Sequence, residues 1–487
     1  MHKTPVFPSW SNQFRDELNR VRSLTGSALH QFELLFQSFI PSYLLAQEDE
    51  GPHSRSRCWN LRLVFWSYLW QVAQAGASCR EAIRQAQSLC RLQGHRVPPP
   101  TTSPYCQARG HLPLQRLDDI QATLCQESQE ALVGRDLWCG HPVQVVDGST
   151  VTLADTPENQ EAYPQQSAQR PGCGFPILRL VALFSLATGL LTGWVTGNWH
   201  QHEMMLVQSL WDHLRANDVL LGDRGFCSWG LLAQCMQRNI RAVFRVRGSR
   251  RGDFRRGRRL SKHERLVRWQ KPRQQLKSVS DQEWLGLPDF LDLRLVRCSL
   301  RIKGFRTTTV VLVTTLLDNV AYPPSALSEL YLRRWNMELT LRSLKSILQM
   351  EHLSCMNPKN VERELRMHLL VHNLVRRIML QAARAHRVPL GRISFAGALA
   401  CCRRFGEAML QTSSKRKRRQ LFDEMIRLIA ADEVPERPGR REPRALKRRN
   451  KPYPYLTTHR HRFREIPHKS RYWHGGSPHK KHRFMRA

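Results

Sequence analysis

The sequence predicts an α/β fold in which a strand-containing core lies between two mostly helical regions. The core is indicated by residues 140–247, where short apolar runs bounded by turn residues alternate with segments of helical length. The helical regions are residues 1–130 and 351–435, in which helix-length segments dominate. A chain of 487 residues is long enough to bury a large core and to form several domains.

The N-terminal region, residues 1–130, predicts a helical domain. Leu61–Gln74 is strongly apolar and aromatic, and Gln115–Gln129 has the pattern of an amphipathic helix. Between these two segments, Pro98-Pro99-Pro100 begins a linker that is rich in Pro, Thr and Ser. Periodicity alone fits a plain helical bundle as well as a domain with a binding role.

The pattern of residues 140–247 predicts seven strands and helices, whose order is typical of a known fold. In sequence they are the strand Pro142–Leu153, the hairpin strands Ile177–Leu186 and Leu190–Thr196, the helix His202–Leu214, the strand Val219–Asp223, the helix Trp229–Arg238 and the strand Ile240–Val246. Three strands, a helix, a strand, a helix and a strand is the order of a ribonuclease-H-like domain. In that fold the first and fourth strands each carry a metal-binding acid, and a late helix supplies a third.

Residues 248–325 interrupt this core and predict a strand-rich insertion. The segment opens with a basic run over Arg250–Lys262 and continues with β-rich stretches at Leu291–Ile302 and Thr307–Leu316. A charge run is often only a solvated surface, but a basic run near the metal-binding acids of such a fold also suits contact with DNA.

The chain then returns to helical patterns. Residues 326–350, after Pro323-Pro324, predict the helix that completes the core, since proline is tolerated at a helix start. A helical C-terminal region follows over residues 351–435. From 436 to 487 the chain is basic, rich in Pro and His and poor in aliphatic residues, which predicts a tail that is disordered without a partner.

The charge balance indicates a polyanionic partner. The chain has 76 Lys and Arg against 40 Asp and Glu, a formal net charge of +36. Nucleic acid is the first candidate for such a partner, and an anionic membrane surface is its rival.

A membrane location is not expected. The longest apolar stretch, Leu180–Val195, is short for a helical span and is interrupted at Ala187-Thr188-Gly189, so it predicts a buried hairpin. Polar residues interrupt the first segment of the chain, which argues against a secretory signal. The 13 cysteines are scattered and include no CxxC pair, which favours reduced thiols in a cytoplasmic or nucleoid setting.

Three acids form a candidate metal site. Asp147 and Asp223 each end an apolar run, and Glu338 lies in the later helix. Hard divalent cations prefer oxygen ligands, and carboxylates from separate elements can hold a pair of Mg²⁺ ions for phosphodiester chemistry. Any one of these acids alone could be a surface, turn or capping residue; the three together, at these places in the fold, favour metal binding.

Glu338 has unusual neighbours on its helix. At about 100° per residue, Tyr331, Arg334, Glu338 and Lys345 fall within an arc of about 60° on one helix face. Arg334 and Glu338 could be a simple i,i+4 ion pair. The full set instead suggests that Arg334 and Lys345 contact backbone phosphates of DNA, with Tyr331 packing or hydrogen bonding beside them.

These residues resemble those of a known family. Tyr331-x2-Arg334-x3-Glu338-x6-Lys345 is similar to the Tyr-Arg-Glu-Lys motif of bacterial insertion-sequence DDE transposases of the insertion-sequence-four type. Val146-Asp147-Gly148-Ser149 resembles the first aspartate motif of that family, and Leu221–Phe226 resembles the second. The similarity extends over about residues 30–400 and includes the N-terminal end-binding region and the insertion.

The resemblance implies a cut-and-paste DNA transposase in the bacterial cytoplasm. Such an enzyme cleaves strands at the element ends and transfers the freed 3′-hydroxyl into target DNA. It implies two Mg²⁺ ions, with Mn²⁺ as a substitute, held by Asp147, Asp223 and Glu338. It also implies double-stranded DNA as partner, a homodimer in the synaptic complex, and DNA contacts from Tyr331, Arg334 and Lys345. Family members hold a flipped base, for which Trp269 or Trp284 of the insertion is a candidate, although either fits core packing equally well.

Two alternatives remain open from the sequence. The first is a ribonuclease-H-like nuclease that cuts DNA without joining it. The second is a non-catalytic DNA-binding protein in which the acids are structural, an option motivated by the basic tail.

Overall fold

The computed structural model describes residues 30–46, 58–92, 94–247, 254–300, 308–412, 414–435, 456–459 and 462. The side chains of residues 335–339, which include Glu338, lie outside this description. The predicted disordered tail, residues 436–487, also lies outside the described residues except for 456–459 and 462.

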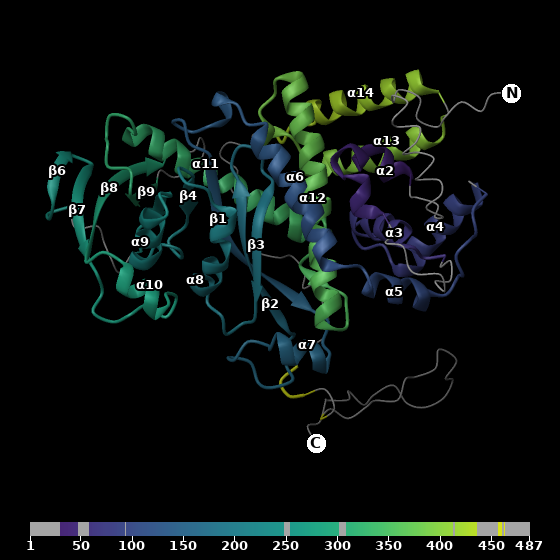
Figure 1. The fold of residues 1–487 in the computed structure, drawn as a ribbon, viewed down its shortest axis with the longest axis horizontal. Coiled ribbons are helices and arrows are strands. Elements are labelled where there is room, and N and C mark those ends of the chain that lie inside the picture. Colours follow the sequence, from purple (N-terminus) through teal and green to yellow (C-terminus); the bar gives the residue numbers. More distant parts are fainter. Residues whose placement is uncertain are drawn as a thin grey trace, which may run out of the picture.

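A ten-stranded mixed sheet runs through the molecule (Figure 1). Its strand order is β3-β2-β1-β4-β5-β9-β8-β7-β6, and β10 pairs with β1 outside this path. The strands are β1 (Val143–Leu153), β2 (Ile177–Ser185), β3 (Leu191–Gly197), β4 (Val219–Gly222), β5 (Arg241–Arg245), β6 (Arg258–Ser261), β7 (Glu264–Gln270), β8 (Phe290–Leu300), β9 (Thr308–Thr314) and β10 (His352–Leu353). The first three strands are antiparallel, β4, β5 and β10 run parallel to β1, and β6 to β9 form antiparallel pairs. The predicted α/β class is therefore present, with a large mixed sheet and many helices.

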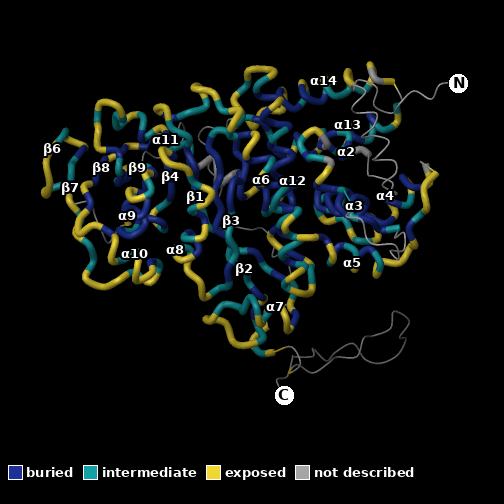
Figure 2. Tube along the Cα trace, viewed as in Figure 1, coloured by how far each residue is buried: buried dark blue, intermediate teal, exposed yellow. Residues whose placement is uncertain are grey.

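Helices from both ends of the chain pack together beside this sheet. They are α2 (His30–Phe36), α3 (Leu61–Ala73), α4 (Cys79–Leu92), α5 (Thr102–Gly110) and α6 (Leu114–Glu130) from the first region, and α12 (Pro358–His386), α13 (Phe395–Leu410) and α14 (Lys415–Ala431) from the last. Helix α12 contacts α3, α5 and α6 as well as α13 and α14. One apolar cluster joins them, and Figure 2 shows α12 and the central strands as mainly buried. The domain boundaries drawn from the sequence remain predictions.

The remaining helices cover the sheet or lie at its edge. They are α7 (Pro157–Ala162), α8 (Glu203–Leu206), α9 (Trp229–Gln237), α10 (Asp281–Gly286) and α11 (Pro324–Arg342). In β1, Val143 and Val145 pack in the apolar cluster that includes α11 and α12, whereas Val146 packs in a second cluster with α8 and α9. Because side chains alternate along a strand, the odd-numbered positions of β1 face α11.

Most of the predicted elements are present, with small shifts at their ends, but two are different. The helix predicted at His202–Leu214 is the single turn α8 followed by the 3₁₀ helix η4 (Val207–His213). The helix predicted over 326–350 is α-helical only as far as Arg342 and continues as the π-helix η6 (Ser343–Ile347). In this π-helix the backbone N–H of Leu348 donates to the Ser343 carbonyl at 3.0 Å, five residues back.

The insertion contributes strands to the same sheet. Its four strands, β6 to β9, were predicted in part from the β-rich stretches around residues 291–302 and 307–316. Strand β9 pairs with β5 through Val243–Thr314, Phe244–Val313 and Arg245–Leu312, so the sheet passes from the core into the insertion. The insertion is therefore hydrogen bonded to the core edge.

The apolar stretch Leu180–Val195 is a hairpin, as expected. Strands β2 and β3 pair antiparallel around a turn at Gly189, which has a φ of +68°. Among the residues that the structure describes, no helix has the length and apolar character needed to cross a membrane.

Candidate active site

Both predicted aspartates lie at the same level of two neighbouring parallel strands. Asp147 is in β1, and Asp223 directly follows β4. The strand register pairs Val146 with Gly222, so the two aspartates occupy the next position on each strand. Both continue the odd-numbered series that faces α11, and both are half-buried. The fold thus places the two carboxyl groups side by side under α11.

The same register adds a residue that the sequence argument missed. Gly222 of β4 pairs with Phe244 of β5, so Arg245 stands next to Asp223 on the third parallel strand. Asp147, Asp223 and Arg245 therefore form a row across β1, β4 and β5. The sequence signal for Arg245 was its position at the end of an apolar strand, but its neighbour could be identified only once the strand order was known.

Local turns hold the two carboxylates. Asp147 Oδ1 accepts from the N–H of Gly148 at 2.9 Å, and Asp223 Oδ1 accepts from the N–H of Gly225 at 2.6 Å. A Cβ at position 225 would lie 2.8 Å from Asp223 Oδ1, so glycine gives the carboxylate room for this bond. A Cβ at position 148 would overlap the carboxylate of Glu203, a further acid that lies on the opposite face of the sheet from Asp147.

Helix α11 brings Tyr331 and Arg334 over this row. It contacts both β1 and β4. Tyr331 is buried and hydrogen bonded to Arg334, whose Cζ lies 5.5 Å from the tyrosine ring centroid. Burial raises the pKa of Tyr331, the positive charges of Arg334 and Arg245 oppose this rise, and the charge of Asp223 adds to it. The phenol is therefore neutral at physiological pH and lies within electrostatic reach of Asp223 and Arg245.

The other two residues of the predicted helix face are placed less directly. Glu338 lies on α11 seven residues after Tyr331, about two turns along the helix, but its side chain is outside the described residues. Lys345 lies in the π-helix η6 and is half-buried. Since a π-turn is wider than an α-turn, the arc of about 60° calculated for a straight helix does not extend to Lys345. The prediction that Lys345 shares this arc with Tyr331, Arg334 and Glu338 is therefore wrong.

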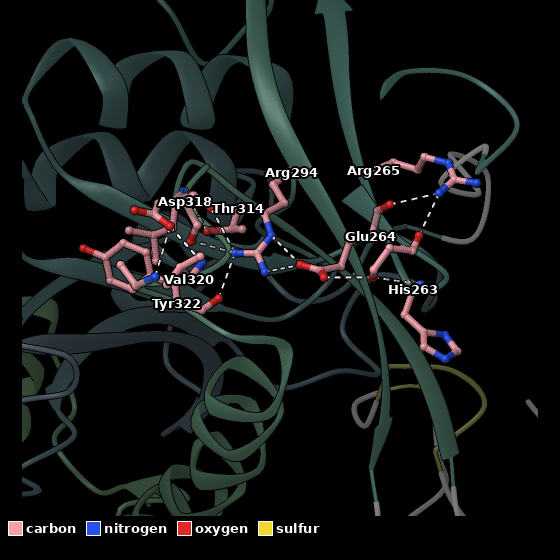
Figure 3. A network of polar contacts seen from close by, with 11 residues as sticks. His263, Glu264, Arg265, Arg294, Thr314, Asp318, Val320 and Tyr322 are labelled. Atoms are coloured by element: carbon pink, nitrogen blue, oxygen red, sulfur yellow. Dashed lines mark hydrogen bonds and ion pairs between the residues drawn. The ribbon is translucent and has the colours of Figure 1, made fainter. Parts of the chain in front are cut away.

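A buried network fixes the start of α11 (Figure 3). Arg294 of β8 has no exposed side-chain surface and pairs with Glu264 of β7, whose side chain is 4% exposed. Its Nη1 donates to the carbonyl oxygens of Asp318 at 3.2 Å and Tyr322 at 2.8 Å, in the loop that leads into α11. The insertion therefore holds the end of this loop.

The same loop is tied to the starts of the two strands that carry the aspartates. The Tyr322 hydroxyl lies 2.8 Å from His141 Nε2, and the other ring nitrogen of His141 lies 2.9 Å from the carbonyl oxygen of Asn217. His141 precedes β1 by two residues, and Asn217 precedes β4 by two residues. One set of contacts thus fixes α11 relative to β1, β4 and the insertion.

The donor set is suited to a hard divalent cation. Two carboxylates lie side by side on one face of the sheet, and carboxylate oxygens are the ligands that Mg²⁺ and Mn²⁺ prefer. No cluster of three or more metal-binding side chains occurs among the residues described, a set that excludes the Glu338 side chain. The nearby cations, Arg245 and Arg334, are placed to neutralise additional negative charge, as a bound phosphate would bring.

Comparison with known proteins shows which family this region resembles. Residues 138–374, which contain both aspartates and α11, match the family model described as "Transposase DDE domain". This region is therefore similar to transposase DDE domains, in agreement with the resemblance predicted from the sequence.

One individual relative is an insertion-sequence transposase. The chain is 29% identical over 248 residues to "Transposase InsG for insertion sequence element IS4" of Escherichia coli (strain K12). That match covers 50% of this chain and 54% of InsG, so the chain spans about half the length of that relative. A solved piggyBac transposase synaptic complex with hairpin DNA overlaps 82% of this chain and 84% of its own at 12% identity, with a TM-score of 0.41, too low to support a conclusion.

Proposed function

We propose that this chain is a metal-dependent DNA transposase that moves an insertion sequence by a cut-and-paste route. The observation that carries the proposal is the pair Asp147 and Asp223, at the same level of two parallel strands under α11, within the region similar to transposase DDE domains. The order of strands and helices around them supports a ribonuclease-H-like core. The reactions would be strand cleavage at element ends and 3′-hydroxyl transfer into target DNA.

Asp147, Asp223 and Glu338 would hold the divalent metal, with Mg²⁺ as the natural ion and Mn²⁺ as a substitute. A bound pair of such ions supplies Lewis-acid activation of the attacking oxygen and stabilisation of the leaving oxygen. The role of the protein is then to place the scissile phosphate between the aspartates and α11 and to exclude competing orientations.

Basic groups beside the aspartates would bind the DNA backbone. Arg334 is held against Tyr331 by a hydrogen bond and ring contact, so its position is restricted before DNA arrives. Arg245 adds a cation at the end of the row of strand residues. Lys345 would contact a phosphate further along the strand, since it lies beyond the α-helical part of α11.

Other properties of the whole protein belong to the same proposal. Residues 1–130 would bind the element ends, residues 248–325 would contact DNA as the insertion, and 436–487 would add charge-based affinity. A homodimer would hold two ends in the synaptic complex, associated with the bacterial nucleoid.

The test is cleavage of a labelled duplex that carries the terminal inverted repeat found beside the gene in its source DNA. With Mg²⁺ we expect the wild type to nick this duplex, and Asp147→Asn to cleave it about 100-fold more slowly or worse, the scale of losing one preorganised electrostatic group. Asp155→Asn is the matched control, since Asp155 is an exposed carboxylate just beyond the same strand. Equal cleavage by wild type and Asp147→Asn would refute the assignment.

Strand transfer is tested separately with ends that already carry a free 3′-hydroxyl. Products joined to a target plasmid support a transposase. Cleavage without joined products would identify a nuclease instead, and tight binding without cleavage would identify a DNA-binding protein.

A further inference from the structure

A large cavity lies between α11, η6, α12 and the segment that follows α12. Its volume is about 990 Å³. Thr340 and Arg333 of α11 line one side, and Ser346 of η6 lies next to them. The opposite wall is formed by α12 and the residues after it, including Arg376 and Arg387.

This cavity is separate from the candidate active site. Arg333 follows Tyr331 by two residues, which is about 200° around the helix, whereas Arg334 is only about 60° from Tyr331 on the helix surface. Tyr331 and Arg334 face the aspartates, so Arg333 and Thr340 point to the other side of α11. Helix α11 therefore separates the wall formed by Arg333 and Thr340 from the active site, whereas Arg342, about 20° from Tyr331 on the helix surface, lies where the two sites meet.

The cavity is strongly basic. Seven arginines line it, together with a single acid, Asp136. Arg384 pairs with Asp136 at 3.3 Å, and Arg392 pairs with Glu433 at 2.9 Å. The other five have no ion pair with any described residue; they are Arg135, Arg333, Arg342, Arg376 and Arg387.

Arg376 is the most informative of these arginines because it is buried. Its exposed fraction is 8%, and its Nε donates to the carbonyl oxygen of Gly189 at 3.3 Å. A Cβ at position 189 would overlap the guanidinium, so the glycine in the β2–β3 turn makes room for it. Burial lowers the pKa of Arg376 to about 10, which still leaves it charged at physiological pH. A buried cation is costly unless an anion meets it, and its own fold supplies none among the described residues.

A second buried polar group faces the same space. His372 lies one turn before Arg376 on α12, is fully buried and lines the cavity. Its Nε2 has no hydrogen-bond partner among the described residues. Ser346 adds a hydroxyl from the π-helix, so the walls offer both charge and hydrogen-bonding groups to an anionic ligand.

We propose that this cavity binds the phosphodiester backbone of a DNA strand on the side of α11 away from the metal-binding acids. Guanidinium groups suit phosphate because they donate two parallel hydrogen bonds. A flexible polyanion can enter a concave site to reach Arg376, whereas the surface of a bilayer stays outside it. This assignment rests on the proposed function, since it takes the polyanion to be DNA.

The test is the salt dependence of DNA binding by the full chain without a divalent metal. Arg135 and Arg387 are exposed residues of the cavity lining that lie outside α11, so Arg135→Gln with Arg387→Gln should leave the fold and the active-site face of α11 intact. Each phosphate contact contributes about 0.9 to the negative log–log slope, so the double variant should lower that slope by about 1 to 2. The matched control, Arg416→Gln with Arg419→Gln on the exposed face of α14, removes the same charge elsewhere and should leave the slope closer to that of the wild type.

The outcomes separate this proposal from the proposed function. An equal loss of slope in both double variants, or no loss in either, would overturn the cavity assignment even if the wild type cleaves DNA. A reduced slope specific to the cavity variant would support it even if no cleavage were seen. A rise in thermal midpoint with inorganic phosphate as large as with an oligonucleotide of equal phosphate concentration would show a small-anion site instead and would also overturn it.

Discussion

Replacing Glu264 by glutamine tests how the insertion holds the start of α11. The change leaves the Arg294 guanidinium in the interior beside a neutral amide. Water cannot replace the lost ion pair, because the exposed fractions of the Arg294 and Glu264 side chains are 0% and 4%. Removing one charge of a buried pair costs about 3–5 kcal/mol. We expect a loss of stability of about 3 kcal/mol, at the lower end of this range. The reason is that glutamine keeps an acceptor oxygen and Arg294 keeps its hydrogen bonds to the carbonyl oxygens of Leu316, Asp318 and Tyr322.

Hydrogen exchange followed by mass spectrometry measures this loss of stability separately in each segment of the chain. The method does not require the whole chain to unfold in one step. A loss of about 3 kcal/mol corresponds to about 100-fold faster exchange in the peptides of β7, β8 and the first turns of α11. The matched control is Asp292→Asn. Asp292 pairs with Arg268 at 2.8 Å between the same two strands, but the side chains are 49% and 59% exposed, so exchange in this variant should stay close to that of the wild type.

Two results would refute this reasoning. If the two variants gave equal exchange, the pair of Glu264 and Arg294 would not be buried as described. If Glu264→Gln accelerated exchange in β7 and β8 but left α11 unchanged, the insertion would not hold that helix.

Three further predictions concern individual side chains. Arg376→Met should raise the thermal midpoint of the free protein and weaken DNA binding, because an apolar side chain replaces a buried cation; a lower midpoint together with unchanged DNA binding would contradict this. Burial lowers the pKa of His368 to about 4 and of His372 to about 3. As the pH falls below about 6.5, both histidines therefore become protonated in the unfolded chain before they do so in the folded protein. Stability should therefore drop by about 1.4 kcal/mol per pH unit for each histidine between about pH 6 and 4.5, and His372→Gln should show a shallower drop in urea titrations at pH 7.5 and 5.5. The sulfurs of Cys79 and Cys106 lie 3.8 Å apart, so a thiol oxidant such as diamide should join them, and a non-reducing peptide map of wild type beside Cys79→Ser should show that cross-link only in the wild type.

The sequence indicated the aspartate pair because each acid ends an apolar run, although β1 continues to Leu153 and only Asp223 lies at the end of its strand. It could not indicate Arg245 in the same way. That residue becomes part of the row only through the order of β1, β4 and β5 and the register that pairs Gly222 with Phe244. Register across non-adjacent segments depends on the complete sheet, and no local pattern encodes it.

Two other features were outside the reach of local patterns. Glu264 and Arg294 lie 30 positions apart in strands that alternate charged and apolar residues, so each suggests a solvated side chain until the strands are paired. The change from α-helix to π-helix after Arg342 has no clear composition signal, since Ser343–Ile347 contains ordinary helix-compatible residues. The π segment packs against α12 and α13, which follow it in the chain.

The π-helix also bears on how the spacing between Glu338 and Lys345 can change among related chains. A π segment is equivalent to an α-helix that has gained one residue without losing its continuity. Deleting one residue from Ser343–Ile347 would restore regular α-helical hydrogen bonding and would leave the residues after the deletion at nearly their present orientation relative to Tyr331 and Arg334, because the π-turn holds one extra residue in about the same rotation. Leu348 and Met350, both fully buried, would then stay in the core. The spacing of six residues between the glutamate and the lysine is therefore tied to the irregular turn that contains the lysine, and a chain with one residue fewer there would keep the same helix packing with a regular α-helix.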